Sequence, residues 1–199
     1  MTSATLSHPA VTAGKATSAR DSRGSVAPGF LSSVGIEVLK MRRLRVLLVA
    51  AILITVSILM SALQLGSMAK HGQLSDPGAQ PWAALLSSMT FDNAMIQPLF
   101  VAILASRQTD IEHTGAGWNL AATSGLTPGA LCRVKLAALT LLIVPATIAQ
   151  SAVLIIVARV MGLSLPLDVG PWVAYTLLLA LVNIAMCAYH LWLAAVVEN

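Results

Sequence analysis

The amino-acid sequence predicts an all-α fold, a polytopic transmembrane helix bundle with four spans and additional cytoplasmic helices. Apolar residues make up 57% of the chain and charged residues 10%, whereas a soluble domain has roughly 45–50% apolar and about 25% charged residues. Four runs with few or no charges are each long enough to cross a hydrocarbon core of about 30 Å. The basic residues flank these runs instead of forming a basic domain, so we expect a lipid bilayer and no nucleic acid as the partner.

Residues 1–33 are predicted to form a disordered cytoplasmic tail. They are rich in Ser, Thr, Ala, Gly and Pro and carry few bulky apolar side chains, so they cannot offset the entropy lost on ordering the chain. A transit peptide is the alternative interpretation, because Arg20 and Arg23 lie in a Ser-rich stretch with Asp21 as the only acid. A secretory signal is excluded, because the first apolar run begins only after residue 45 and is too long for one.

Residues 34–199 are predicted to form the transmembrane domain, which opens with the sequence GIEVLKMRRLR at 35–45. As a helix this segment would lie in the membrane plane, with apolar side chains toward lipid and basic ones toward anionic headgroups. The alternative is a simple positively charged stop before the first span. Both interpretations place it at the inner membrane surface. The residues predicted at that surface are Glu37, Lys40, Arg42, Arg43 and Arg45, together with Arg133 and Lys135 before the third span.

The four predicted spans cover residues 46–68, 82–105, 136–158 and 171–197. The first and the fourth contain no charged residue. The second is less uniform, because Asp92 and several uncharged polar residues interrupt it. The third contains Pro145, which predicts a kink supported by neighbouring helices.

The distribution of basic residues predicts the orientation of the chain. Of the 12 Lys and Arg residues, only Lys70 and Arg159 fall on the side opposite to the amino terminus. Because positive residues that flank spans are retained in the cytoplasm, we expect a multi-pass protein of the cell membrane with a cytoplasmic amino terminus. Trp82 and Trp172 begin the two inward-running spans and Trp192 lies near the end of the fourth, as is typical of tryptophans at membrane interfaces.

The connection 106–135, between the second and third spans, has a pattern of its own. Gly115 and Gly117 predict a break after the second helix, and a short helix follows at 118–124. Thr127 before Pro128 predicts a restart, because an N-cap residue there precedes a proline at the first helical position. Such a segment can press one small helix against another protein.

Two stretches together resemble a known family. Glu37, Lys40 and Arg43 precede the first span, and Glu112, Trp118 and the sequence TSGLTPGALCRVK precede the third. This order is similar to permeases of the type-2 ABC exporter family, including those of bacterial peptide-antibiotic immunity systems, over roughly residues 35–199. Members of that family resemble a six-span bundle, whereas this chain ends after its fourth predicted span. The resemblance therefore favours a fragment, and the alternative is that two spans come from elsewhere.

The resemblance implies a permease subunit of an ATP-driven exporter, which forms the substrate pathway with a second permease copy or relative. A coupling helix in the 106–135 connection would contact a separate ABC ATPase subunit. The residues implied in that contact are Glu112, His113, Trp118, Asn119 and Leu120.

The chain carries no motif for nucleotide or metal chemistry. It has no G-x-x-x-x-G-K-[ST] phosphate loop, so we expect ATP on the partner, no cofactor in this chain and no enzymatic activity of its own. Cys132 and Cys187 are single and far apart, and no histidine spacing predicts a metal site.

Polar residues inside the predicted spans are candidates for the pathway: Asp92, Gln150 and Asn183. A carboxylate in the membrane usually faces a bundle interior, although Asp92 near the outer end of its span can instead touch water. Gln150 and Asn183 fit hydrogen bonds between helices. The spans hold no dense ring of charge, which favours an apolar or amphipathic cargo.

The alternative function is a non-transporting membrane scaffold or sensor that binds a cytoplasmic partner through the 106–135 connection. An intramembrane enzyme is disfavoured, because no paired catalytic groups occur in the sequence. An ATPase with a phosphate loop recovered together with the chain would favour transport, whereas any other partner would favour the scaffold.

Overall fold

The computed structural model describes residues 29–43, 45–114, 123 and 127–197. Every regular element in these residues is a helix, and no strand occurs among them, which confirms the predicted all-α class. The elements are α1 (Phe30–Arg43), α2 (Val46–Lys70), the short 3-10 helices η1 (Gln73–Ser75) and η2 (Pro77–Ala79), α3 (Pro81–Thr114), α5 (Pro128–Val160) and α6 (Val169–Val197).

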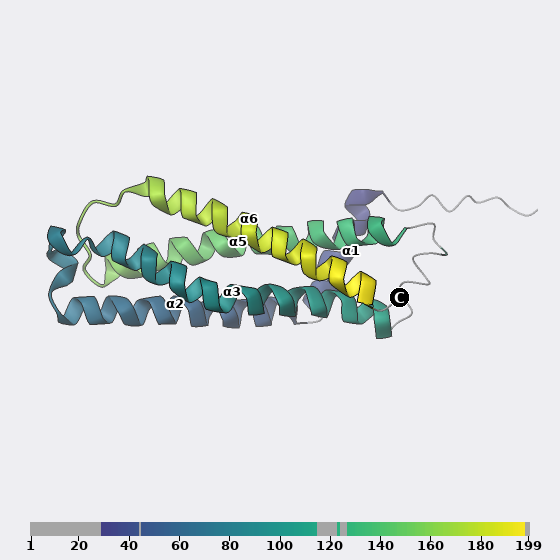
Figure 1. The fold of residues 1–199 in the computed structure, drawn as a ribbon, viewed down its shortest axis with the longest axis horizontal. Helices are drawn as coiled ribbons and strands as arrows, with labels where there is room; N and C mark the ends of the chain where they lie inside the picture. The colour runs from purple at the N-terminus through teal and green to yellow at the C-terminus, as the bar shows by residue number, and fades with distance from the viewer. Residues whose placement is uncertain (1–28, 44, 115–122, 124–126, 198–199) are drawn as a thin grey trace, which may run out of the picture.

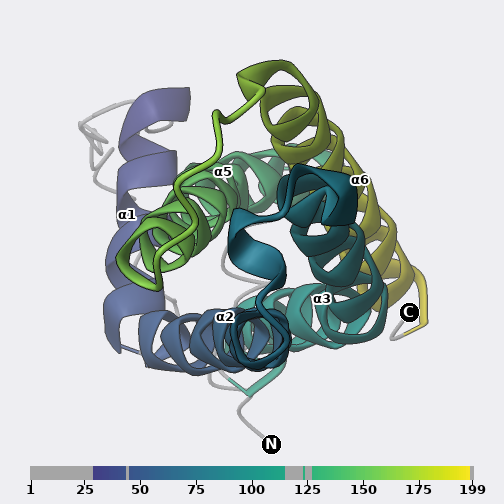
Figure 2. The same ribbon diagram turned by 90° about the vertical axis from the view of Figure 1, so that its left-hand side faces the viewer.

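Four long helices run lengthwise and α1 lies across one end of them (Figure 1). Helices α2 and α6 each pack against both α3 and α5, so the four form a ring in the order α2, α3, α6, α5 (Figure 2). Helix α1 packs on the outside of this ring, against α5 and α2. We refer to this end as the α1 end, and to the end that carries η1 and η2 as the opposite end.

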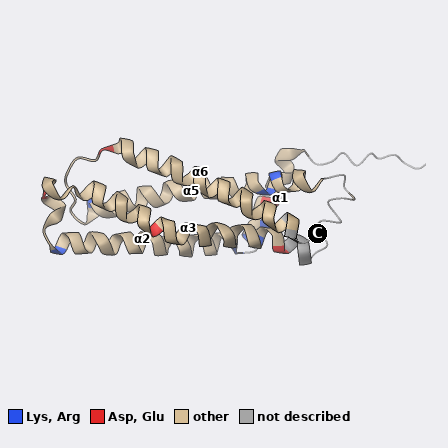
Figure 3. Ribbon diagram, in the orientation of Figure 1, with Lys and Arg blue, Asp and Glu red and all other residues tan. Residues whose placement is uncertain are grey.

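All four long helices are long and apolar enough to cross a membrane, which confirms the predicted number of candidate spans. Charged residues gather at the two ends of the bundle and leave a long stretch of mostly uncharged ribbon between them (Figure 3). Helix α3 continues to Thr114 and α5 begins already at Pro128, so both extend beyond the predicted spans into the 106–135 connection.

Local sequence signals explain why these helices begin and continue where they do. Thr127 is the N-cap of α5, because its Oγ1 atom accepts a hydrogen bond from the amide of Ala130 at 3.2 Å, and Pro128 follows at the first helical position, as predicted. Both α3 and α5 contain an internal proline, Pro98 and Pro145, and continue through it.

The interior of the bundle is layered along its length. One apolar core lies toward the α1 end and includes Val46, Leu104 and Leu139. A second apolar core lies toward the opposite end and includes Leu65 and Leu154. Between these two cores the buried positions of the helices are largely polar, as the positions of the buried Ser, Asn and Gln residues show. The buried polar residues of this middle layer are Ser57, Ser61, Asn93, Gln97, Thr147, Gln150, Ser151 and Asn183.

Candidate functional site

The carboxylate of Glu37 is the centre of a buried cluster at the α1 end. Its Oε2 atom accepts hydrogen bonds from Lys135 Nζ at 2.9 Å and from Gln108 Nε2 at 2.8 Å. Its Oε1 atom accepts one from Lys40 Nζ at 2.6 Å. Lys135 Nζ also donates to the backbone carbonyl of Gln108 at 3.0 Å. These four residues, here called the Glu37 cluster, connect α1 to the last part of α3 and the first part of α5.

The structure corrects the predicted surface position of two members of this cluster. Lys135 is fully buried and Glu37 is only 3% exposed. The reason is that α1 crosses the bundle with Val34, Glu37 and Met41 turned inward, so the carboxylate needs partners inside the protein. Its partner Lys135 lies 98 positions later in the chain, where the sequence pattern gave no sign of a pair.

The other predicted surface residues lie on the outside of the same end. Arg42, Arg45 and Arg133 are exposed, and Lys40 is half-buried beside Glu37. Arg43 belongs to α1, but its side chain lies outside the described residues. Contact of these residues with a membrane surface remains a prediction.

The predicted coupling residues belong to the end of α3 and to the chain that follows it. Glu112 and His113 are in the last turn of α3, but their side chains lie outside the described residues, as do Trp118, Asn119 and Leu120 altogether. The structure does place the two helices that bracket them. Because Lys135 Nζ donates a hydrogen bond to the Gln108 carbonyl, the Glu37 cluster joins the two helices that bracket this connection.

Uncharged side chains form a hydrogen-bonded network in the middle layer. Asn93 Oδ1 accepts hydrogen bonds from Ser57 Oγ at 3.0 Å and Gln150 Nε2 at 2.8 Å, and Asn93 Nδ2 donates to Tyr175 Oη at 2.9 Å. Gln150 Nε2 also donates to Ser57 Oγ at 2.6 Å, and Gln97 Nε2 donates to Gln150 Oε1 at 3.3 Å. Each of the four long helices supplies at least one member of this amide network.

The three candidate pathway residues have different surroundings. Gln150 belongs to the amide network. Asp92 is partly buried, and its Oδ2 atom accepts a hydrogen bond from Ser61 Oγ at 2.8 Å beside a surface cavity of about 570 Å³ between α2 and α3. Asn183 is fully buried on α6, and neither of its side-chain polar atoms has a partner among the described residues.

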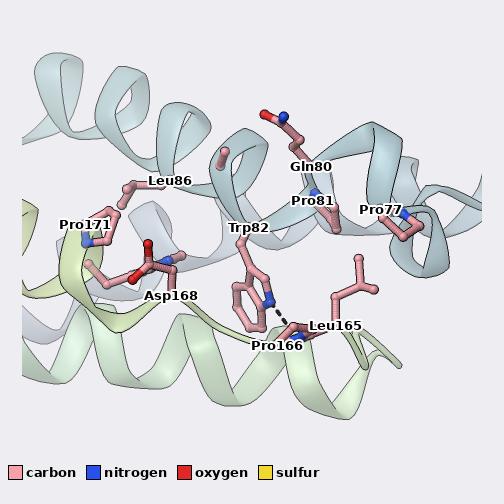
Figure 4. Close-up of a pocket in the computed structure, with 11 residues that line it drawn as sticks. Pro77, Gln80, Pro81, Trp82, Leu86, Leu165, Pro166, Asp168 and Pro171 are labelled. Carbon is pink, nitrogen blue, oxygen red and sulfur yellow. Dashed lines mark hydrogen bonds between the residues drawn. The ribbon is translucent and has the colours of Figure 1, made fainter.

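A cavity of about 370 Å³ lies at the opposite end, between the start of α3 and the connection from α5 to α6 (Figure 4). Trp82 Nε1 donates a hydrogen bond to the carbonyl of Leu165 at 3.0 Å, and the Trp82 and Trp172 rings meet edge to face with centroids 6.0 Å apart. The Arg159 guanidinium lies 5.0 Å from the Trp82 ring centroid. Both tryptophans are thus buried against protein, whereas the sequence predicted them at the lipid interface.

Sequence reasoning missed the role of Ser57 and Tyr175 in the middle layer. A signal for the layer was present, because Ser57 and Ser61 are four residues apart, as are Asn93 and Gln97, and residues at this spacing share one helix face. Within the part of the chain that the structure describes, no three His, Cys, Asp or Glu side chains gather as a metal site.

Comparison with known proteins identifies one related family. The family described as ABC-2 family transporter protein matches residues 33–199. This range contains the Glu37 cluster, the amide network and all four long helices. No curated protein and no solved structure matches the chain.

Proposed function

Because the chain belongs to the family of ABC-2 transporter proteins, we propose that it is the membrane-spanning permease subunit of an ATP-driven exporter, driven by a separate ATPase subunit. In this proposal the four long helices contribute to the substrate pathway, and a second permease copy or relative completes it. The chain supplies no nucleotide chemistry, which resides on the ATPase.

The Glu37 cluster is the observation that carries this proposal. One buried carboxylate accepts hydrogen bonds of 2.6–2.9 Å from side chains of α1, α3 and α5, and α3 and α5 are the two helices that the 106–135 connection joins. A displacement of that connection therefore acts on three helices together, because breaking a buried ion pair by moving one partner away is strongly unfavourable. Packed helices of this kind move between discrete arrangements, as a transport cycle requires.

The face that meets the ATPase is the 106–135 connection. Trp118 and Leu120 would fill an apolar groove on the ATPase as anchor residues, since buried aromatic residues dominate the energy of many interfaces. Glu112 and His113 would add electrostatic contacts. The Glu37 cluster would then pass the resulting shift to the long helices.

The proposed orientation puts the α1 end in the cytoplasm and the chain in the cell membrane. Helix α1 supports this arrangement, because it lies across the bundle and exposes Leu31, Ile36 and Leu39 as well as the basic Arg42. A helix with exposed apolar and basic side chains suits the boundary between lipid tails and anionic headgroups.

A pair of tryptophan substitutions tests the proposal. Trp118→Ala is expected to reduce recovery of the ATPase with the tagged chain by about tenfold or more, because an aromatic anchor is lost. Membrane insertion of the variant should be unchanged. Trp192→Ala is the matched control, because Trp192 is 58% exposed near the end of α6 that lies at the α1 end, outside the connection.

Equal ATPase recovery with Trp118→Ala and Trp192→Ala would contradict the proposed contact. If the unchanged chain recovers a partner other than an ATPase, and Trp118→Ala loses that partner, the scaffold or sensor role would be established instead. Transport activity reconstituted with the co-purified ATPase in vesicles completes the test.

A further inference from the structure

We propose that the surface cavity between α2 and α3, here called the Asp92 groove, binds a small amphipathic cation whose amine group pairs with Asp92. The proposal rests on the proposed function, since it names the cargo class of that permease. The groove has a volume of about 570 Å³, within the range of about 300–1,000 Å³ that is typical of small-molecule sites. Helices α2 and α3 are neighbours in the ring (Figure 2).

Asp92 lies within the hydrocarbon depth of the bundle. Its hydrogen-bond partner Ser61 is nine residues before Lys70, the last residue of α2, or about 14 Å by helical rise. Asp92 itself is 11 residues after Pro81, the first residue of α3, or about 17 Å. Because α2 has 25 residues and is about 37 Å long, a hydrocarbon core of about 30 Å takes up most of it. The carboxylate therefore lies well inside that core, where ionised groups are rare and usually face a pathway or a partner.

One oxygen of this carboxylate is available to a ligand. The Oδ2 atom of Asp92 accepts a hydrogen bond from Ser61 Oγ at 2.8 Å. The Oδ1 atom has no partner among the described residues and is not buried, since Asp92 is partly exposed on the groove wall. No ion pair within the described part of the chain includes Asp92. A ligand in the groove can thus reach a charged acceptor that the protein itself leaves unused.

The long helices supply no positive charge at this depth. Their basic residues all lie within seven residues of a helix end: Lys70, Arg107, Arg133, Lys135 and Arg159. A second copy of the chain in the same orientation carries these residues at the same depths, so it cannot provide the counter-charge either. Because a charge removed from water is costly unless it is paired, a cationic ligand is the partner that suits Asp92.

The rest of the wall is part polar and part apolar, which sets the class of the cation. Gln64 and Ser87 are exposed on the wall, and their side-chain oxygens can accept further N–H donors of an ammonium group, which has three. The apolar residues of the wall are Met60, Leu63, Ala84 and Phe91. These side chains suit an aliphatic or aromatic body, so the groove fits an amine that carries an apolar chain.

A photoreactive amine tests the site in the full chain, reconstituted in nanodiscs of zwitterionic phosphatidylcholine. The probe is dodecylamine with a diazirine in the middle of its chain. The matched alcohol and the matched carboxylate carry the same diazirine, and affinities are compared at equal probe concentration in the bilayer. We expect the amine to label α2 and α3 with about tenfold higher affinity than the alcohol, because it adds a charge-assisted hydrogen bond to Asp92. The carboxylate should leave the groove unlabelled.

The variant Asp92→Asn separates a ligand role from a structural one. Its amide oxygen can still accept the hydrogen bond from Ser61, but the charge is lost. It should abolish the preference for the amine over the alcohol while alcohol labelling persists. Its thermal stability should stay equal or rise, because a charge inside the membrane is replaced by a neutral group. Asp168→Asn, which removes a carboxylate outside the groove, is the control and should keep the amine preference.

A cation built into the groove gives an independent test. Gln64 lies three residues from Ser61 on α2 and lines the same groove, so both share one helix face. Gln64→Lys should therefore compete with the ligand for Asp92 and lower amine affinity about tenfold, while alcohol labelling persists. Gln64→Met has a side chain of similar length without a charge and should keep the amine preference.

The proposal is overturned if the unchanged chain binds amine and alcohol equally, if Asp92→Asn keeps the preference, or if Asp168→Asn loses it as well. A cross-link between the Ser87→Cys positions of two chains that the amine does not diminish would show that a second copy covers the groove, and would also overturn it. Amine preference without ATPase recovery would contradict the proposed function and leave the binding site standing. ATPase recovery without amine preference would do the reverse.

Discussion

At the scale of single residues, Glu37 and Lys135 illustrate how a buried charge is accommodated. Removal of both groups from water is costly, and their attraction compensates only when the geometry is good and the remaining polar atoms are bonded. Here Lys135 Nζ lies 2.9 Å from Glu37 Oε2. Gln108 and Lys40 donate further hydrogen bonds to the oxygens of the same carboxylate. The pair should therefore contribute more to the uniqueness of the packing than to its net stability.

Substitution of one partner tests this view. Lys135→Met should lower the free energy of unfolding by about 3 kcal/mol, because Glu37 stays buried and loses the cation 2.9 Å from its Oε2 atom. The double variant Glu37→Met, Lys135→Met should recover most of that loss. Denaturant unfolding in detergent micelles measures both. Arg133→Met, two residues away and exposed, is the control and should change stability by no more than about 0.5 kcal/mol. A loss for Lys135→Met no larger than that of the control contradicts the account.

The amide network permits a double-mutant cycle. Ser57 Oγ and Gln150 Nε2 are 2.6 Å apart, so Ser57→Ala and Gln150→Leu should be coupled by about 0.6 kcal/mol, with an upper limit of about 1.7 kcal/mol. Ser57→Ala combined with Thr140→Val should instead be additive, because Thr140 bonds only within its own helix in the described contacts. Additive behaviour of the first pair would show that the network bond contributes nothing measurable.

Single polar residues were predictable from the sequence, but their partners were not. Asp92, Gln150 and Asn183 stand out because they interrupt apolar runs. Which of them meet depends on the rotation of each helix about its axis, and hydropathy alone does not fix that rotation. For the same reason the partnership of Glu37 with Lys135 was not visible in a stretch that reads as a basic surface segment.

At the scale of the elements, local sequence signals predicted where α5 begins, but they did not predict which helix faces pack against one another. The Thr127–Pro128 start of α5 depends on residues adjacent in the chain, and the structure confirms it. The contact between Trp82 and Trp172 joins residues from two different helices, so it depends on the packing of the whole bundle. The sequence indicated that each tryptophan begins a span. It did not indicate that the two rings would pack edge to face against each other.

The N-cap of α5 gives a prediction at this scale. Thr127→Ala should remove about 1 kcal/mol of local stability and speed hydrogen exchange of the Ala130 amide about fivefold, because that amide loses its side-chain acceptor. Exchange followed by mass spectrometry in nanodiscs measures the change. Thr140→Ala, which removes a hydroxyl from the interior of the same helix, should leave the Ala130 amide unaffected. Unchanged exchange in Thr127→Ala would mean that the cap does not hold the start of α5.

At the scale of the whole molecule, an uncharged polar layer lies between two apolar cores. The number of long apolar helices followed from hydropathy, because a run of about 20 apolar residues is what a helix needs to cross a hydrocarbon core. Hydropathy did not predict the polar layer between the two apolar cores. That layer forms only because all four long helices place polar residues at the same position along the length of the bundle. The same layer contains the amide network and the buried Asn183 of α6, so the four long helices bring uncharged hydrogen-bonding groups together in the middle of the bundle.

The central claim is that the chain between α3 and α5 faces the cytoplasm, where an ATPase can act on it. Labelling of single cysteines in intact cells with a membrane-impermeant maleimide tests this claim most directly, in a background that lacks Cys132 and Cys187. The account predicts that Asn119→Cys reacts only after the membrane is permeabilised, whereas Ser75→Cys, in η1 at the opposite end, reacts in intact cells. Labelling of Asn119→Cys in intact cells, with Ser75→Cys protected, would contradict it.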